Sequence, residues 1–125
     1  MNTLLRILVV VPGIFFTCIG LLWLIAPANA AAALGMPLLD GVGRSTQVAD
    51  MAVFFLALGM MTVLAAISLK SRWFQLPALI LLGAAAFRVL AWLVHDAALA
   101  VEPIALEVVV ACLLLFASAR LAEKE

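Results

Sequence analysis

Three ionisable residues, Asp50, Arg88 and Glu107, lie inside stretches of sequence that are otherwise apolar. An ionisable side chain at the centre of a membrane-spanning helix costs about 2.5–3.5 kcal/mol on insertion scales, so such residues mark candidate functional sites. Two carboxylates that face one arginine leave an excess negative charge, which a proton, a histidine or a ligand can balance. The three residues therefore predict a site that binds a polar head group or passes a proton.

Helical spacing adds further polar residues to this candidate site. Arg88 and His95 share a helix face at i and i+7, and Gln47 and Asp50 share one at i and i+3. Each of the three ionisable residues lies within about two turns of the outer end of its expected helix, so they are predicted to meet in the outer half of the bilayer. The remaining acidic residues near that end, including Glu102, are expected to lie in water.

The segment GVGRS at residues 41–45 precedes the stretch that contains Asp50. Glycines before a helix start leave backbone N–H donors that attract anions, although a plain turn from loop to helix has the same composition. Because the segment lies above Asp50, we expect Arg44 to lie at the rim of the site.

A structural interpretation of the three ionisable residues stands beside the functional one. Arginine has a planar guanidinium group that can hold two carboxylates, so Arg88 is suited to pin its helix to its neighbours. Buried charges need partners whether or not they take part in chemistry.

Acidic groups beside a histidine can perform acid–base chemistry. However, no nucleophile, metal-ligand set or cofactor motif accompanies them, so we predict no catalytic residues, no metal and no cofactor, and favour a non-enzymatic role.

The composition shows what kind of elements must position these residues. Of 125 residues, 69% are hydrophobic and 11% are charged, with a mean hydropathy of +1.34. Soluble domains have about 45–50% apolar and about 25% charged residues, and a small domain cannot bury such an excess. The chain is thus predicted to be an integral membrane protein in contact with the lipid bilayer. A soluble enzyme, a nucleic-acid-binding protein and a disordered chain are excluded.

Four apolar stretches are long enough to cross a bilayer, which takes about 20 helical residues. They run over about residues 4–26, 46–69, 73–94 and 103–119. Because unsatisfied backbone groups are costly in lipid, we predict one all-α, membrane-spanning four-helix bundle over residues 1–125. The first stretch is longer than the apolar core of about 7–15 residues in a signal peptide, which favours a span over a cleaved signal. Residues 28–34, in the first connection, are expected to form a short helix at the outer interface.

The basic residues predict the orientation of this bundle. If the helices alternate, five basic residues fall on one side: Arg6, Lys70, Arg72, Arg120 and Lys124. Only Arg44 falls on the other side, so the positive-inside rule places both termini in the cytoplasm. We therefore expect a multi-pass membrane protein with its N- and C-termini on the cytoplasmic side.

Small residues at helical spacing predict where the helices pack closely. The first span carries one set and the second span another: Gly13, Thr17 and Gly20, then Ala52, Gly59 and Ala66. Helices in membranes associate through close packing of such residues. Packing within one chain is the simpler interpretation, and a seam between copies in a homo-oligomer is the alternative.

The combination of GVGRS, Asp50 in the second span, Arg88 within FRVLAW in the third and Glu107 in the fourth resembles small bacterial four-helix membrane proteins of the DoxX-like group. This resemblance implies a four-helix bundle in the bacterial inner membrane and carries no assured activity. The sequence as a whole favours a non-enzymatic protein whose outward-facing pocket binds a small amphipathic ligand, such as a lipid or a quinone. The alternatives are an accessory subunit of a larger membrane complex and a proton-linked transporter or channel.

Overall fold

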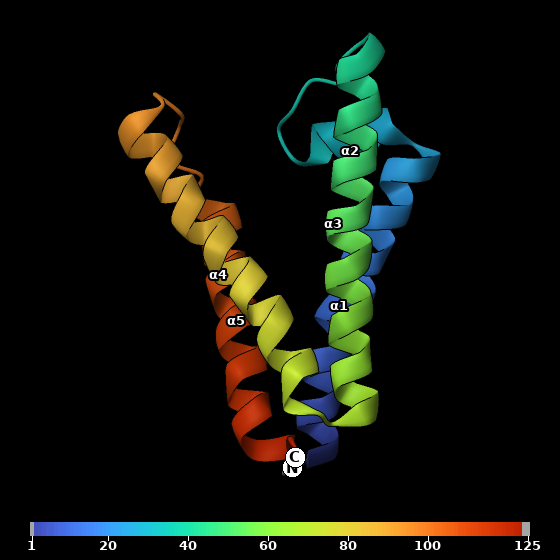
Figure 1. Ribbon diagram of the computed structural model, residues 1–125, viewed down its shortest axis with the longest axis vertical. Helices are drawn as coiled ribbons and strands as arrows, with labels where there is room; N and C mark the ends of the chain where they lie inside the picture. The colour runs from blue at the N-terminus through green and yellow to red at the C-terminus, as the bar shows by residue number, and fades with distance from the viewer. Residues whose placement is uncertain (1, 124–125) are drawn as a thin grey trace.

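The computed structural model describes residues 2–123 and is built from helices (Figure 1). No β-strand forms within that range, which confirms the predicted all-α class. The helices are α1 (Asn2–Ile25), α2 (Pro27–Ala33), α3 (Gly41–Ser68), α4 (Ser71–Val94) and α5 (Val101–Leu121).

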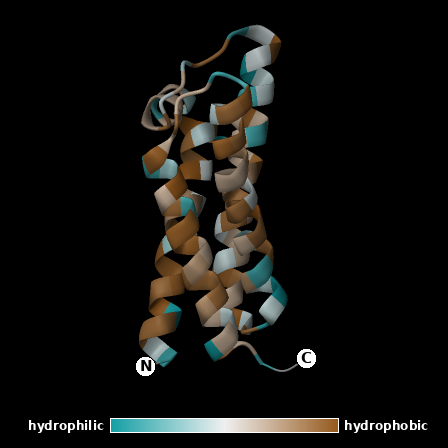
Figure 2. Cartoon of the chain, turned by 90° about the vertical axis from the view of Figure 1, so that its left-hand side faces the viewer, coloured by the Kyte–Doolittle hydropathy of each residue, from teal (hydrophilic) through white to brown (hydrophobic). Residues whose placement is uncertain are grey.

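Four of these helices are long and apolar enough to cross a membrane, namely α1, α3, α4 and α5. The shortest, α5, has 21 residues and therefore spans about 31 Å at about 1.5 Å per residue, close to the thickness of a bilayer core. Apolar residues run along these helices and hydrophilic ones gather toward their ends (Figure 2). The predicted membrane-spanning bundle is confirmed, and α2 is the short helix expected in the first connection.

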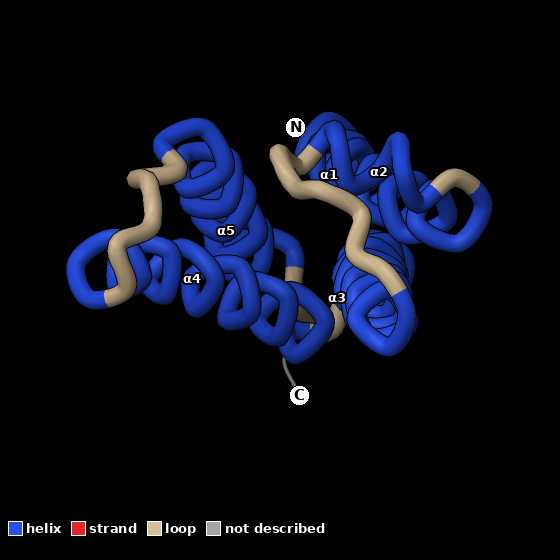
Figure 3. The backbone as a smooth tube through the Cα atoms, turned by 90° about the horizontal axis from the view of Figure 1, so that it is seen from above, coloured by secondary structure: helices blue, strands red, loops and turns tan. Residues whose placement is uncertain are grey.

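The helices are arranged as two pairs, α1 with α3 and α4 with α5 (Figures 1 and 3). The start of α1, the end of α5 and the turn between α3 and α4 lie together at one end of the bundle, which we call the terminal end. Helix α2 and the segments 34–40 and 95–100 lie at the other end, which we call the loop end. The two pairs meet at the terminal end and diverge toward the loop end.

Helix α3 begins at Gly41, five residues before the expected start of the second span near residue 46. The GVGRS segment forms the first turns of the helix. Arg44 holds this start in place, because its Nε donates to the Leu39 carbonyl oxygen at 2.8 Å and its Nη2 lies 3.2 Å from Asp40 Oδ1. These contacts compensate for the low helix propensity of glycine.

Glycines bring α1 and α3 into close contact along what we call the glycine seam (Gly13, Gly20 and Gly59). A Cβ atom added to Gly59 would lie 2.5 Å from the backbone nitrogen of Thr17, and one added to Gly20 would lie 2.8 Å from that of Leu56. Both distances are shorter than real Cβ contacts, so only glycine permits this approach. The two predicted sets of small residues therefore pack against each other within one chain.

The buried core explains why the pairs join at one end only. The main cluster draws on all four spans and includes Val9, Leu58, Phe74 and Leu114, each fully buried. A second cluster, around Trp23, contains only residues of α1, α2, α3 and the segments that adjoin them. At the loop end, the buried clusters therefore cover the α1–α3 pair without including α4 or α5.

Candidate functional site

Arg88 and Glu107 form an ion pair that links α4 to α5. Arg88 Nε donates a hydrogen bond to Glu107 Oε1 at 2.9 Å. The Glu107 side chain is 10% exposed, whereas that of Arg88 is 41% exposed. Within residues 2–123, the two terminal guanidinium nitrogens of Arg88 make no hydrogen bond. The pair therefore uses the Nε donor of Arg88 and leaves its terminal N–H donors available.

The antiparallel helices place the two side chains at the same depth. Arg88 lies six residues before Val94, and Glu107 lies six residues after Val101, so each is about 9 Å from the loop end of its helix. Glu107 also shares a helix face with the buried residues Ala111 and Leu114, which turns its carboxylate toward the interior. The position of Glu107 on the apolar face of α5 is therefore what buries it.

A cavity of about 620 Å³ adjoins the ion pair. Ligand pockets in proteins range over about 300–1,000 Å³ and are mostly apolar with a few polar groups. This cavity fits that description, since its ionisable lining residues are Arg88, Glu102 and Glu107 among apolar side chains from all four spans. It also receives Met36 from the segment after α2. The cavity thus occupies the region where the two helix pairs diverge.

Four phenylalanines form the wall of the cavity on the α1–α3 side. The ring centroids of Phe15 and Phe16 are 5.5 Å apart, those of Phe16 and Phe55 are 6.1 Å apart, and those of Phe54 and Phe55 are 5.1 Å apart. These separations fall in the range of favourable aromatic pairs. A continuous aromatic surface therefore faces the helices that carry the ion pair.

The charged lining residues lie in the half of the cavity nearer the loop end, among apolar ones such as Met36. Glu102 lies in the first turn of α5, at the loop end, and the ion pair lies about 9 Å along the helices. Leu81 lies about 20 Å along α4 from Val94, deeper still. The cavity is therefore charged toward the loop end and apolar toward the middle of the bundle.

The structure does not place Asp50 with Arg88 and Glu107. Its side chain is exposed on α3, and it neither lines the cavity nor forms an ion pair within the described residues. His95 is also exposed, and it caps α4 through its backbone N–H, which donates to the Ala91 carbonyl oxygen at 2.9 Å. The expected cluster of three ionisable residues is thus reduced to one pair, because Asp50 lies on the exposed surface of α3 near the end where the two helix pairs diverge.

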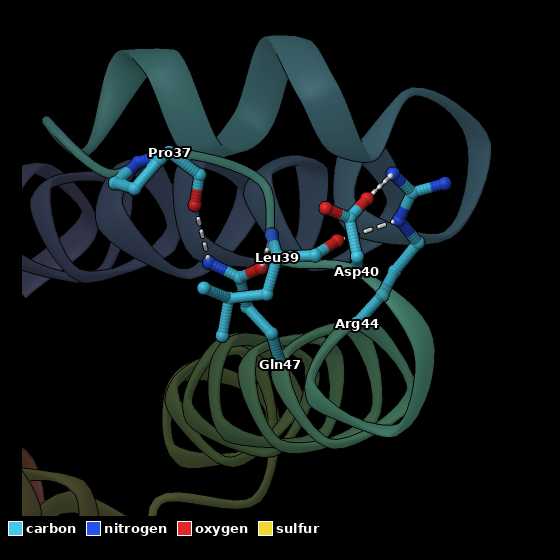
Figure 4. Close-up of polar contacts among 5 residues, drawn as sticks. All are labelled: Pro37, Leu39, Asp40, Arg44 and Gln47. Carbon is cyan, nitrogen blue, oxygen red and sulfur yellow. Dashed lines mark hydrogen bonds and ion pairs between the residues drawn. The ribbon is translucent and has the colours of Figure 1, made fainter.

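Gln47 and Arg44 hold the segment before α3 rather than the ion pair (Figure 4). Gln47 is buried, its Nε2 donates to the Pro37 carbonyl oxygen at 3.1 Å, and its Oε1 accepts from the Leu39 N–H at 2.9 Å. The same segment contributes Met36 to the cavity lining. Gln47 and Arg44 do not line the cavity themselves. They contact the segment that contributes Met36 to its lining.

The sequence reasoning missed two contributors to the cavity. Glu102, expected in water, is exposed but lines the cavity, and the aromatic wall was not singled out. Two signals for them exist in the sequence. Glu102 and Leu106 are spaced i, i+4 on α5, and so are Pro103 and Glu107. The two pairs are shifted by one residue, so all four residues fall on one side of the helix. The aromatic wall comes from two Phe-Phe doublets, at residues 15–16 and 54–55.

Neither a metal site nor a known relative helps to assign this cavity. Across residues 2–123, no group of three or more His, Cys, Asp or Glu side chains is placed to hold a metal ion. No protein-family model, curated protein or solved structure matches the chain. The resemblance to the DoxX-like group therefore stays a prediction.

Proposed function

We propose that this protein is a non-enzymatic, multi-pass protein of the bacterial inner membrane that binds a small amphipathic ligand, such as a lipid or a quinone, in the cavity between its helix pairs. The observation that carries the proposal is a 620 Å³ cavity with an ion pair and a further carboxylate toward one end and apolar side chains beyond them. Amphipathic molecules have the same division between a polar head and an apolar tail.

The ion pair supplies the polar contact in this proposal. Glu107 occupies only Nε of Arg88, so the terminal N–H groups can donate to an oxygen of the ligand. A hydrogen bond from a charged donor in a poorly solvated place is stronger than one between neutral groups. The structural role of the pair is retained, because the same arginine fastens α4 to α5 and presents donors to the cavity.

The proposed orientation places the cavity in the outer leaflet. Four described basic residues lie toward the terminal end, and Arg44 lies at the loop end: the four are Arg6, Lys70, Arg72 and Arg120. Under the positive-inside rule the terminal end faces the cytoplasm, and the charged part of the cavity then lies near the outer surface. A distant relationship to the DoxX-like group is in keeping with this bundle and forms part of the proposal.

Retention of amphiphiles by the purified protein tests this function. Native mass spectrometry in a mild detergent is expected to show the wild-type chain with bound lipid or quinone. Ala84 lines the cavity, so Ala84→Phe should occlude it and remove the adduct. Ala86→Phe is the matched control, because Ala86 is exposed on the same helix and lies outside the lining. A wild-type chain without adducts, or equal adducts in Ala84→Phe, would overturn the proposal.

A further inference from the structure

The charges that line the cavity indicate which head group it accepts, provided that it binds an amphiphile as proposed above. One cation, Arg88, stands against two carboxylates, Glu107 and Glu102. Arg88 and Glu107 compensate each other, but Glu102 has no ion-pair partner within residues 2–123. The lining therefore carries one uncompensated carboxylate at the end nearest the loops and two unused arginine nitrogens below it.

From this arrangement we infer that the ligand is a zwitterionic phospholipid with a primary ammonium head group, whose phosphate contacts Arg88 and whose ammonium contacts Glu102. The guanidinium group binds phosphate oxygens through parallel N–H donors, and a primary ammonium provides three donors for a carboxylate. A lipid with a net negative charge satisfies Arg88 equally well. However, it adds to the negative charge of Glu102 and Glu107 instead of compensating it.

The order of the groups along the cavity agrees with this assignment. Glu102 and Glu107 are separated by five residues of α5, or about 7.5 Å along the helix axis, with Glu102 nearer the loop end. In an ethanolamine phospholipid the ammonium lies on the water side of the phosphate, two carbons away, and the acyl chains lie on the opposite side. The aromatic wall and Leu81 follow in that opposite direction, where the acyl chains would run.

The fit concerns the head and the upper part of the chains. A cavity of about 620 Å³ holds part of a phospholipid, and it is open to its surroundings, since Leu106 and Phe15, which line it, are 45% and 48% exposed. Acyl chains can therefore leave the cavity sideways into the surrounding bilayer, as a lipid ligand requires.

A competition between two phospholipids with identical acyl chains tests the inference. The wild-type chain in dodecyl maltoside is mixed with equal amounts of dioleoyl-phosphatidylethanolamine and dioleoyl-phosphatidylglycerol, and bound lipid is counted by native mass spectrometry. We expect phosphatidylethanolamine adducts to exceed phosphatidylglycerol adducts by about five-fold, because one lipid compensates Glu102 and the other does not.

Glu102→Gln should bring the ratio of the two lipids close to one while total lipid binding persists. Asp96→Asn is the matched control, since Asp96 is an exposed acidic residue at the same end that does not line the cavity, and it should keep the wild-type ratio. An unchanged ratio in Glu102→Gln, or a wild-type preference for phosphatidylglycerol, overturns the inference. If neither lipid binds wild type more than it binds Ala84→Phe, the proposed function fails for phospholipids, and the inference fails with it.

Discussion

Helix α3 has two interfaces that differ in how closely the neighbouring helices approach. Toward α1, the glycine seam brings backbone within a distance that excludes even a Cβ atom at Gly59. Toward α4 and α5, the large side chains Phe54, Phe55 and Leu58 line a cavity of about 620 Å³. The first interface is closed along its length, whereas the second is closed only where the main core joins all four spans at the terminal end.

The difference shows that small residues on α3 form the close structural contact, whereas large residues on α3 line the candidate binding site. Small residues permit backbone contact, and the resulting van der Waals packing stabilises helix association in lipid without a hydrophobic driving force. Large residues on the diverging helices line the space between them and provide a surface for another apolar molecule. In α4, Gly83 meets nothing within 4 Å of an added Cβ, so a glycine does not close an interface unless a second helix lies opposite it.

The largest effect is expected from a side chain placed in the seam. Gly59→Val would put atoms against the Thr17 backbone nitrogen and the Gly13 carbonyl oxygen, 2.5 and 2.7 Å from the new Cβ. Overpacking of this kind costs about 3 kcal/mol or more where backbone cannot yield. Thermal unfolding in detergent should show a large loss of stability, whereas Gly83→Val, the same change in open space, should alter stability by less than about 1 kcal/mol. Equal losses would mean that the seam is not a close contact.

Removing the arginine of the ion pair should have the next largest effect. Arg88→Met leaves the largely buried Glu107 carboxylate without its partner, and breaking a buried pair in this way costs about 3–5 kcal/mol. Because the Arg88 side chain is 41% exposed, we expect about 2 kcal/mol, measured by unfolding in a denaturing detergent.

A double variant separates the loss of the pair from the loss of packing. Arg88→Met with Glu107→Met removes both charges, so most of the lost stability should return while lipid binding remains reduced. If the double variant is as unstable as the single one, the carboxylate is not the source of the cost. The lost stability would then come from the packing of the Arg88 side chain.

A smaller and more local effect is expected at Gln47, which holds the segment before α3 beside the cavity. Gln47→Leu removes the acceptor of the Leu39 N–H and the donor to the Pro37 carbonyl oxygen. A hydrogen bond contributes about 1 kcal/mol net, so amide exchange at Leu39 should become about five-fold faster. Gln75→Leu, at an exposed site on α4, is the control and should leave this amide unchanged. Equal exchange in both variants would show that Gln47 does not order the loop.

The sequence predicted the closed interface better than the open one, for a physical reason. Four apolar stretches of sufficient length require helices in lipid, and small residues repeating on two of them match the contact that joins α1 to α3. The same periodicity assigns Asp50 to a face of α3 without saying which helix that face meets. Asp50 was therefore grouped with Arg88 and Glu107, and the structure places it on the exposed surface instead.

The cavity and the start of α3 depend on contacts between distant parts of the chain. The divergence of the helix pairs depends on how the four helices pack against one another, which no single span reveals. The GVGRS segment has weak intrinsic helix propensity, yet it forms the start of α3, where Arg44 contacts Asp40 and Leu39. Glu107 was correctly expected within the fourth span, because a carboxylate on an otherwise apolar face is visible from spacing alone.

The smallest effect on stability is expected when the cavity itself is filled. This prediction directly tests the difference between the closed α1–α3 interface and the open one toward α4 and α5. Ala84 lines the cavity and is only partly buried, so the ring in Ala84→Phe has space to occupy and should change stability by less than about 1 kcal/mol. Ala52 is 2% exposed, and its carbonyl oxygen would lie 3.1 Å from a Cβ on Gly20, so Ala52→Phe should force α1 and α3 apart. Unfolding in detergent should separate the two variants by several degrees in midpoint. A large loss in Ala84→Phe would mean that α4 closes on α3 and that the space is not available to a ligand.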